Sequence, residues 1–338
     1  MKLLFIKLQH SVRLFRYVSV YKLFNVFKSI ISYLLSTLKF QKLQDYHPLF
    51  ISIETTDFCN LQCPECPVGR RIRTNPVKSS FDSAVLNKLL VELKPSLLHV
   101  ILYFQGEPFL NNKLFELIKL THDADIYTST STNGQFLNED TARKLVLSGL
   151  DKLIVSIDGS TQQVYETYRV GGNLQKITDG ISSLVACKKR MKSITPFIEI
   201  QFLVLKTNEH QMKDMQLLAK RLQVDRLTFK TAQLNDFENG NELLTSKKRF
   251  ARYKQTKQGN FMLKGHQPNR CWRLWSGAVI NVNGEVLPCC FDKSSEYSFG
   301  NVQNSSFLAC WQGDKASRFR SMILKNRKQV DMCGNCTG

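Results

Sequence analysis

The sequence predicts an α/β fold built on a partial parallel barrel. A basic helical segment comes before the barrel, and a small cysteine-rich hairpin and helix domain comes after it. Residues 49–232 alternate six times between a strand-like apolar run and an amphipathic helical stretch. Repeated β–α units imply a parallel sheet. Six units are too few for a closed eight-fold barrel, so we expect an open (β/α)6 barrel.

The basic segment covers residues 1–48, which hold eight Lys or Arg and one acid, Asp45. Its apolar residues recur at helical spacing, and the longest uncharged stretch, 29–38, is too short to span a bilayer. Residues 1–40 could therefore make a peripheral membrane contact, or the apolar stripe could dock on the protein itself. We favour docking, because such stripes usually pack in a core. The stripe is Val20, Leu23, Phe24, Phe27, Ile30, Ile31, Leu34, Leu35 and Leu38, opposite Lys22, Asn25, Ser29, Ser32 and Ser36.

The barrel elements follow in order. The expected strands are 49–54, 97–104, 125–130, 152–157, 197–205 and 226–230. The expected helices are 82–93, 114–120, 139–147, 161–190 with a break at 171–172, and 209–222. Residues 233–269 are polar, and we interpret them as a solvated linker helix before the tail, 270–338.

Composition and charge limit the class of protein. Of 338 residues, 43% are hydrophobic and 22% are charged, as in a globular chain. Ten cysteines at short spacings indicate metal rather than disulfides. No secretory cleavage site is recognisable, so we expect a cytoplasmic protein, either free or peripheral at the inner face of the membrane. The net charge of +19 could favour binding to nucleic acid, to an anionic membrane or to an acidic substrate. No basic run is interleaved with aromatics, so we expect no nucleic-acid partner.

Three cysteines directly follow the first expected strand. Cys59, Cys63 and Cys66 are separated by three and two residues. Thiolates suit zinc and iron–sulfur clusters, and closed sites of either kind usually use four ligands. Three cysteines without a local fourth indicate a cluster with one open iron. Half a zinc site or a chance group of core cysteines is the alternative.

This spacing after a strand resembles the radical S-adenosylmethionine (radical SAM) superfamily, in which the open iron binds the amino and carboxylate groups of S-adenosylmethionine. The resemblance implies a [4Fe–4S] cluster, S-adenosylmethionine and a flavodoxin- or ferredoxin-type electron donor. The family often has an aromatic residue before the third cysteine, where this chain has Glu65. It has a glycine where this chain has Gln105.

Further family motifs fall at the ends of the expected strands, where chemistry gathers in such sheets. The resemblance places the Gly-Glu-Pro turn beside the cofactor's amino group and an arginine on its carboxylate, which a guanidinium can bind with two hydrogen bonds. It places serine and aspartate of the fourth strand's end near the ribose or methionine portion. The implied cofactor-binding residues are Gly106, Glu107, Pro108, Asn133, Ser156, Asp158 and Arg169.

The tail carries a second set of cysteines. Residues 278–288 predict a hairpin with an Asn-Gly turn, and 315–325 predict a helix. The pattern resembles the SPASM/twitch extension of radical SAM enzymes, which implies an auxiliary [4Fe–4S] cluster. A four-cysteine zinc site is the alternative. The implied ligands are Cys271, Cys289, Cys333 and Cys336, with Cys290 as an alternative to Cys289.

The resemblance also implies the chemistry. A 5′-deoxyadenosyl radical removes hydrogen from the substrate, and the auxiliary cluster accepts an electron. A tail with one cluster is similar to that of radical SAM alcohol dehydrogenases acting on aminocyclitols. We therefore expect an oxidoreductase that oxidises or rearranges a small polar molecule, sugar-, aminocyclitol- or lipid-linked.

Two other classes stay open: an enzyme that modifies a peptide or protein, and a non-enzymatic iron–sulfur scaffold or sensor. The intact Gly-Glu-Pro turn and Arg169 count against the scaffold. The candidates for a general base are Asp292, His266 and Lys230, although each of these is more commonly a surface or structural residue.

Overall fold

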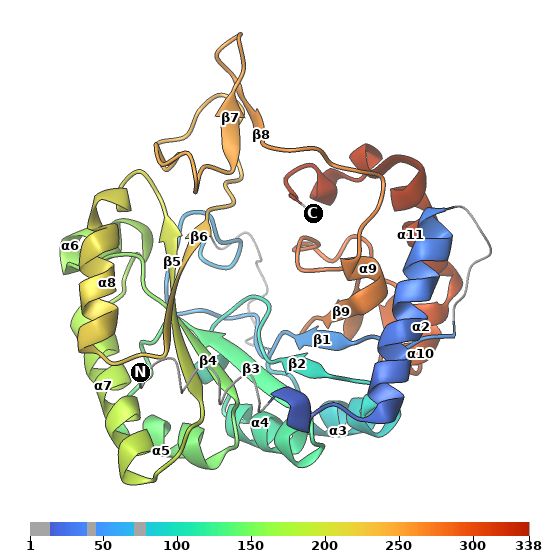
Figure 1. Cartoon of the computed structure of the whole chain (residues 1–338), viewed down its shortest axis with the longest axis horizontal. Coiled ribbons are helices and arrows are strands. Elements are labelled where there is room, and N and C mark those ends of the chain that lie inside the picture. Colours follow the sequence, from blue (N-terminus) through green and yellow to red (C-terminus); the bar gives the residue numbers. More distant parts are fainter. Residues whose placement is uncertain (1–13, 39–44, 71–78, 338) are drawn as a thin grey trace.

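A twisted nine-stranded sheet forms the centre of the molecule (Figure 1). The computed structural model describes residues 14–38, 45–70 and 79–337. The strand order is β11-β10-β9-β1-β2-β3-β4-β5-β6, and strands β1 to β6 run parallel in sequence order. Their bounds are β1 Phe50–Ile53, β2 His99–Ile101, β3 Tyr127–Thr132, β4 Lys152–Ser156, β5 Phe197–Val204 and β6 Arg226–Thr231. The predicted open, partial barrel is confirmed.

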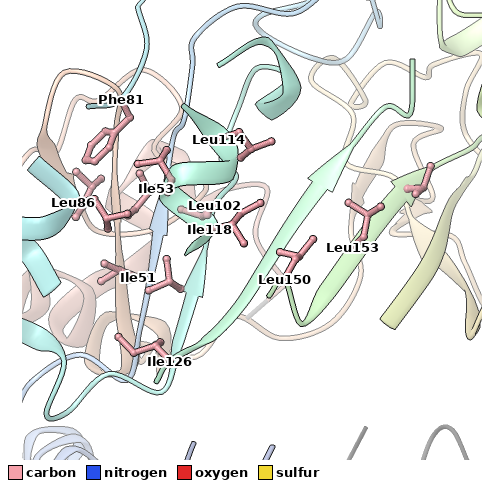
Figure 2. Close-up of a cluster of buried hydrophobic side chains, with 14 of the residues drawn as sticks. Ile51, Ile53, Phe81, Leu86, Leu102, Leu114, Ile118, Ile126, Leu150 and Leu153 are labelled. Carbon is pink, nitrogen blue, oxygen red and sulfur yellow. The ribbon is translucent and has the colours of Figure 1, made fainter. Parts of the chain in front are cut away.

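Helices cover the outer face of this sheet, as Figure 1 shows for α4, α5, α7 and α8. The helix bounds are α3 Ser83–Leu93, α4 Leu114–Asp123, α5 Glu139–Leu147, α6 Gln162–Tyr168, α7 Leu174–Arg190 and α8 Met212–Arg221, with short 3-10 turns η1 Pro108–Leu110 and η2 Glu209–Gln211. The apolar side chains of strands and helices meet in one core (Figure 2). Ile51, Leu86, Ile118 and Leu153 are fully buried there.

The C-terminal domain continues the same sheet. Its hairpin consists of β9 Gly277–Ile280 and β10 Glu285–Leu287, and β11 Gly300–Asn301 pairs with β10. Strand β9 lies parallel to β1, with Phe50 opposite Gly277 and Ile53 opposite Ile280. The predicted hairpin and helix are confirmed, but their attachment to the barrel sheet was not predicted. The remaining elements are α9 Arg273–Ser276, α10 Phe307–Gln312, α11 Asp314–Asn326, η3 Arg327–Gln329 and η4 Asp331–Cys333.

The connection between barrel and tail corrects one prediction. No helix forms in residues 233–269, all of which the structure describes; instead β7 Tyr253–Gln255 and β8 Phe261–Leu263 form an antiparallel pair. Leu234, Leu243 and Tyr253 are buried beneath it, together with Leu61 and Cys63 of the cysteine loop. The polar composition concealed these few apolar anchors, which pack against the cysteine loop, whereas most of the segment is exposed as predicted.

The N-terminal helix corrects a second prediction. Helix α2, Val20–Thr37, begins after Ser19, whose side chain accepts a hydrogen bond from the Lys22 N–H. It lies along the C-terminal domain in Figure 1. The helix docks as favoured, but through its polar side. Its buried residues are Lys22, Asn25, Ser29, Ser32 and Ser36, while the predicted apolar stripe faces mainly outward.

Candidate functional site

The three-cysteine loop begins where β1 ends and lines a cavity of about 550 Å³. The backbone N–H of Cys66 donates to the Cys63 carbonyl at 3.1 Å, and the Leu61 N–H donates to the Cys59 sulfur at 3.4 Å. A Cβ at Gly69 would lie 2.5 Å from the Cys63 carbonyl oxygen, so glycine is required for this close packing. The loop is therefore held by its own backbone and directs its sulfurs into the cavity.

Two polar side chains donate hydrogen bonds to these sulfurs. The Asn133 amide, just past β3, lies 3.8 Å from the Cys59 sulfur, and an Arg169 guanidinium nitrogen lies 3.7 Å from the Cys63 sulfur. Burial raises the pKa of Cys59 to about 11 in this metal-free arrangement. Thiolates in such a buried site need nearby donors or bound metal, and this loop has donors in place.

The Gly-Glu-Pro turn packs directly against the cysteine loop. Gly106 has a φ of +71°, and a Cβ there would lie 2.2 Å from the Thr56 carbonyl oxygen. The buried Glu107 carboxylate accepts hydrogen bonds from the Thr132 hydroxyl at 2.6 Å and the Asn133 N–H at 2.7 Å. Burial raises the pKa of Glu107 to about 7 despite these donors. This carboxylate lines the cavity and would be stabilised by a bound cation.

Arg169 and Asp158 form a buried ion pair beside the same loop. The Arg169 Nε lies 2.5 Å from Asp158 Oδ2, and the other Asp158 oxygen accepts from the Leu203 N–H at 2.6 Å. Although burial opposes it, the pKa of Arg169 is raised by Asp158 and Cys63. The pair fixes the guanidinium at the cavity wall. Ser156, at the end of β4, lines the cavity near it.

The four tail cysteines also lie near one another. Burial raises the pKa of Cys333, and so do the neighbouring thiols of Cys336 and Cys271. The Cys289 pKa is raised in the same way, by burial and then by Cys290, Cys271 and Cys333. The buried Arg327 lies beside this group, and its pKa is raised, against the effect of burial, by Cys336, Cys271 and Cys333.

Burial raises the pKa of the Cys290 thiol, Arg273 lowers it, and Cys336 of the tail group raises it further. The Cys290 sulfur accepts a hydrogen bond from Arg273 at 3.5 Å and lines the cavity. Tyr103 and Lys293 line the same cavity, and each is close enough to both Cys66 and Cys290 to feel their charge. The cavity therefore connects the three-cysteine loop with the cysteine pair of the tail.

Among the described residues, no three His, Cys, Asp or Glu side chains converge on a position for a single metal ion. An iron–sulfur cluster binds each cysteine to a different iron, so its ligands do not meet at one point.

The three candidates for a general base are not among the residues that line the cavity. His266 and Lys230 are exposed on the surface. Asp292 is buried, but its carboxylate accepts hydrogen bonds from the N–H groups of Glu296 and Tyr297 and closes a turn. The three residues were candidates only because their side chains can accept a proton, and in the structure none of them lines the cavity.

Three cavity residues were missed. All three carry a positive charge and line the cavity. Arg252 directly precedes β7, Arg273 lies in α9, and Lys293 lies in the loop after β10. Arg273 and Lys293 each lie within three residues of a tail cysteine, which is the signal that could have identified them. Nothing local in the sequence marks Arg252.

Two family models match the chain. Residues 53–229 match the model of the radical SAM superfamily, and residues 271–337 match that of an iron–sulfur cluster-binding domain, SPASM. The first match alone covers more than half of the chain.

The chain belongs to the radical SAM superfamily. The predicted resemblance, including its C-terminal SPASM domain, is confirmed.

Curated relatives of this radical SAM protein differ in what they act on. A GTP 3′,8-cyclase of Limosilactobacillus fermentum is 28% identical over 44% of this chain and 44% of its own length. The chain thus matches less than half of that relative. A tungsten-containing aldehyde ferredoxin oxidoreductase cofactor-modifying protein of Pyrococcus furiosus is 23% identical over 82% of this chain and 84% of its own. Among solved structures, Streptococcus suis SuiB bound to S-adenosylmethionine superimposes with a TM-score of 0.63, at 16% identity over 86% of this chain and 72% of SuiB. That likeness shows the fold.

Membership establishes the cofactors. The radical SAM domain binds a [4Fe–4S] cluster and S-adenosylmethionine, and the SPASM domain binds auxiliary iron–sulfur clusters, as predicted. The residues present fit these groups. Three sulfurs line a cavity with donors beside them, a buried carboxylate faces the same cavity, and three of the tail thiols lie near the buried Arg327. No helix in the described part of the chain is both long and apolar enough to cross a membrane.

Proposed function

We propose that this radical SAM enzyme is an oxidoreductase that oxidises or rearranges a small polar molecule carrying an anionic group. The observation that supports this is the shared cavity. It is lined by the three-cysteine loop on one side, by Cys289 and Cys290 on the other, and by three cations between or beside them. Its volume of about 550 Å³ lies within the usual range of small-molecule sites, roughly 300–1,000 Å³.

The cofactor end of the cavity has a residue for each charged group of S-adenosylmethionine. We assign Cys59, Cys63 and Cys66 to the cluster, Glu107 to the cofactor's ammonium and Arg169 to its carboxylate. Gly106 and Pro108 shape the turn that carries Glu107. Asn133 orients Cys59, while Ser156 and Asp158 serve the ribose or methionine side, Asp158 by holding Arg169. Together the bound cluster and cofactor supply a carbon radical that removes hydrogen from a substrate C–H bond.

The opposite end suits an electron acceptor. We assign Cys271, Cys289, Cys333 and Cys336 to one auxiliary cluster, because Cys289 lies near Cys271 and Cys333, and Cys333 lies near Cys336 and Cys271. Cys290 is left to line the cavity, where Arg273 donates to its sulfur. A cluster with four cysteine ligands has no open iron, which favours electron transfer over substrate binding.

The cations of the cavity define the substrate class. Arg252, Arg273 and Lys293 line it, and the Arg252 Nε has no hydrogen-bond partner among the described residues. Of the two lining carboxylates, Glu65 accepts a hydrogen bond from the Asn235 N–H at 2.7 Å, and Glu107 is the one that we assign to the cofactor's ammonium. The positive charges that line the cavity therefore favour a phosphate or carboxylate on the substrate. A sugar-linked or lipid-linked phosphate has this chemistry.

The substrate class can be tested by deuterium transfer. Anaerobically reconstituted enzyme, S-adenosylmethionine and reductant are incubated with extract from cells grown in deuterated medium, after separation into small-molecule and peptide fractions. Deuterium that enters 5′-deoxyadenosine reports hydrogen removed from a substrate. We expect it from small molecules retained on an anion-exchange resin. Transfer from the peptide fraction alone would instead establish a peptide-modifying enzyme.

A matched pair of variants tests the anion site once a substrate is found. Lys293→Gln removes a cation of the cavity, while Lys254→Gln removes an exposed lysine of β7. We expect KM to rise about tenfold for Lys293→Gln, equivalent to about 1.4 kcal/mol. The Lys254→Gln enzyme should keep the KM of the original. Equal KM values for the two variants would contradict the assignment of Lys293 to substrate binding.

A further inference from the structure

Helix α2 exposes many of its large apolar side chains. Of the nineteen large hydrophobic residues exposed in the described part of the chain, ten lie in residues 14–38. Phe27 is 60% exposed and Leu23 is 57% exposed. We define the outward face of α2 by the seven of these residues that lie in the helix: Val20, Tyr21, Leu23, Phe24, Phe27, Ile30 and Leu34. Leu14, Phe15 and Leu38 are exposed in the residues that flank it. We propose that this face binds the surface of an anionic lipid bilayer.

The opposite side of α2 packs on the body of the protein, and its contacts prevent the helix from rotating to bury its apolar face. The Lys22 ammonium donates to the Asp125 carbonyl at 3.1 Å, and the Asn25 amide exchanges two hydrogen bonds with the backbone of His47. The Tyr33 ring meets Trp272 and Trp275 edge to face, at 5.3 and 5.4 Å between ring centres. Turning the helix would break these contacts and leave polar groups buried without partners. The outward orientation is therefore part of the fold.

Such a surface requires an occupant. Soluble monomers rarely expose a contiguous apolar patch of more than a few hundred Å² unless it has a binding function. A helix with aromatic and leucine residues on one face and basic residues near it is the kind that lies in a membrane interface. In such binding the helix axis lies parallel to the bilayer plane, and its apolar side chains enter the boundary between headgroups and acyl chains.

Charge selects the bilayer over a second copy of the chain. The protein carries a net charge of +19, so two copies meeting through this face would repel each other, whereas anionic headgroups would attract it. The first 48 residues hold eight Lys or Arg and one acid. Of these, Arg16 and Lys28 lie beside the face, and the Lys28 ammonium is 5.2 Å from the centre of the Phe24 ring. Each also forms an ion pair, Arg16 with Asp125 at 3.6 Å and Lys28 with Asp45 at 2.7 Å.

Vesicle flotation tests the proposal with the full-length, cluster-containing enzyme. We expect the protein to float with vesicles of phosphatidylcholine and phosphatidylglycerol, and to float far less with phosphatidylcholine alone or at high salt. The double variant Leu23→Ser/Phe27→Ser should bind the anionic vesicles at least tenfold more weakly. The matched control is Val91→Ser/Leu217→Ser, whose residues are 79% and 67% exposed on α3 and α8. It should bind like the original protein.

Three results would overturn the proposal. The first is absence of flotation with the anionic vesicles, and the second is equal flotation of the two double variants. The third is a dimer, measured by light scattering, that the Leu23→Ser/Phe27→Ser change dissociates, which would assign the face to a second copy. Both variants alter exposed side chains, so their unfolding temperatures and iron content should match the original protein. Agreement in these two measurements shows that a binding defect is not a folding defect.

Discussion

The guanidinium of Arg169 lies 2.5 Å from the carboxylate of Asp158, and the same arginine lies 3.7 Å from the Cys63 sulfur. Asp158 is fully buried, and its second oxygen accepts from the Leu203 N–H on β5. One ion pair therefore connects the end of β4, the segment after α6 and the cysteine loop. The carboxylate sets the position of the arginine before any ligand arrives.

Removing the carboxylate should destabilise the protein. We expect Asp158→Ala to lower the free energy of unfolding by about 3 kcal/mol, because it leaves Arg169 buried without its partner. Denaturant titration of the metal-free protein measures this change. The double variant Asp158→Ala/Arg169→Ala should lose less free energy of unfolding than the two single variants lose in sum. Strict additivity would show that the two residues are not coupled. The exposed pair Arg318 and Asp314 on α11 is the control, and its loss should cost well under about 1 kcal/mol.

The three-cysteine loop should be indispensable for cofactor cleavage. Cys63→Ala should remove the first cluster and abolish formation of 5′-deoxyadenosine, because a cluster held by two cysteines is not retained. Chromatography of the products and iron analysis measure both effects. Cys187→Ala, at a buried cysteine of α7, is the control and should keep both properties. Continued 5′-deoxyadenosine formation by the Cys63 variant would refute its role as a ligand.

Binding of S-adenosylmethionine should depend on pH through Glu107. Burial raises the pKa of this carboxyl to about 7, so it is largely protonated in acid, when it cannot pair with an ammonium. Affinity should increase as pH rises toward about 7 and then level off. Equilibrium binding under anaerobic conditions measures this, and Glu107→Gln should bind more weakly with little pH dependence. Affinity that falls across this range would contradict the assignment.

The Glu107 carboxyl should also make folding stability depend on pH, but its contribution to stability falls as pH rises, whereas cofactor affinity increases. Because its pKa in the folded state is raised, its favourable contribution is complete below the unfolded value of about 4.3 and is lost as pH rises through about 7. In the absence of the cofactor, Glu107→Gln should therefore lose less stability than the original protein between these pH values. Thermal unfolding of the metal-free proteins at several pH values measures the difference.

The tail should hold a second cluster that is separable from the first. The original protein should contain about eight irons per chain, and Cys333→Ala should contain about four while still cleaving S-adenosylmethionine. Cys290→Ala should keep about eight, because we assign Cys289 rather than Cys290 as the ligand. Iron and zinc analysis with electron paramagnetic resonance measures these amounts. About four irons and one zinc in the original protein would contradict the auxiliary-cluster assignment.

The barrel and its cysteine loop could be predicted from the sequence because their signals are local. A buried parallel strand is a short apolar run, and the chemistry at its end is contained in a few adjacent residues. Helix α2 shows where local signals stop. Its periodicity identified two faces, but which of them packs depends on what the body of the protein offers, here the Asp125 carbonyl and the His47 backbone. The cavity cations were missed for the same reason, since Arg252, Arg273 and Lys293 come together only in the fold.

The two departures from the family pattern acquire a role in the structure. Glu65 accepts hydrogen bonds from the N–H and side chain of Asn235, which tie the cysteine loop to the segment after β6. The Gln105 side chain donates to the Lys293 carbonyl at 3.0 Å and so ties the β2 turn to the tail. Each substitution connects the cofactor end of the cavity to another part of its wall. Neither contact could be inferred from residue type, because the partners are distant in sequence.

The pairing of β9 with β1 has a consequence for how the enzyme matures. The strand that leads into the first iron site has β2 on one side and a strand from the other end of the chain on the other. In a nascent chain that has not yet produced residue 280, β1 would be an edge strand. Its backbone N–H and C=O groups on that side would be unpaired, which makes a chain prone to aggregation. Assembly of the first cluster should therefore follow, rather than precede, synthesis of β9.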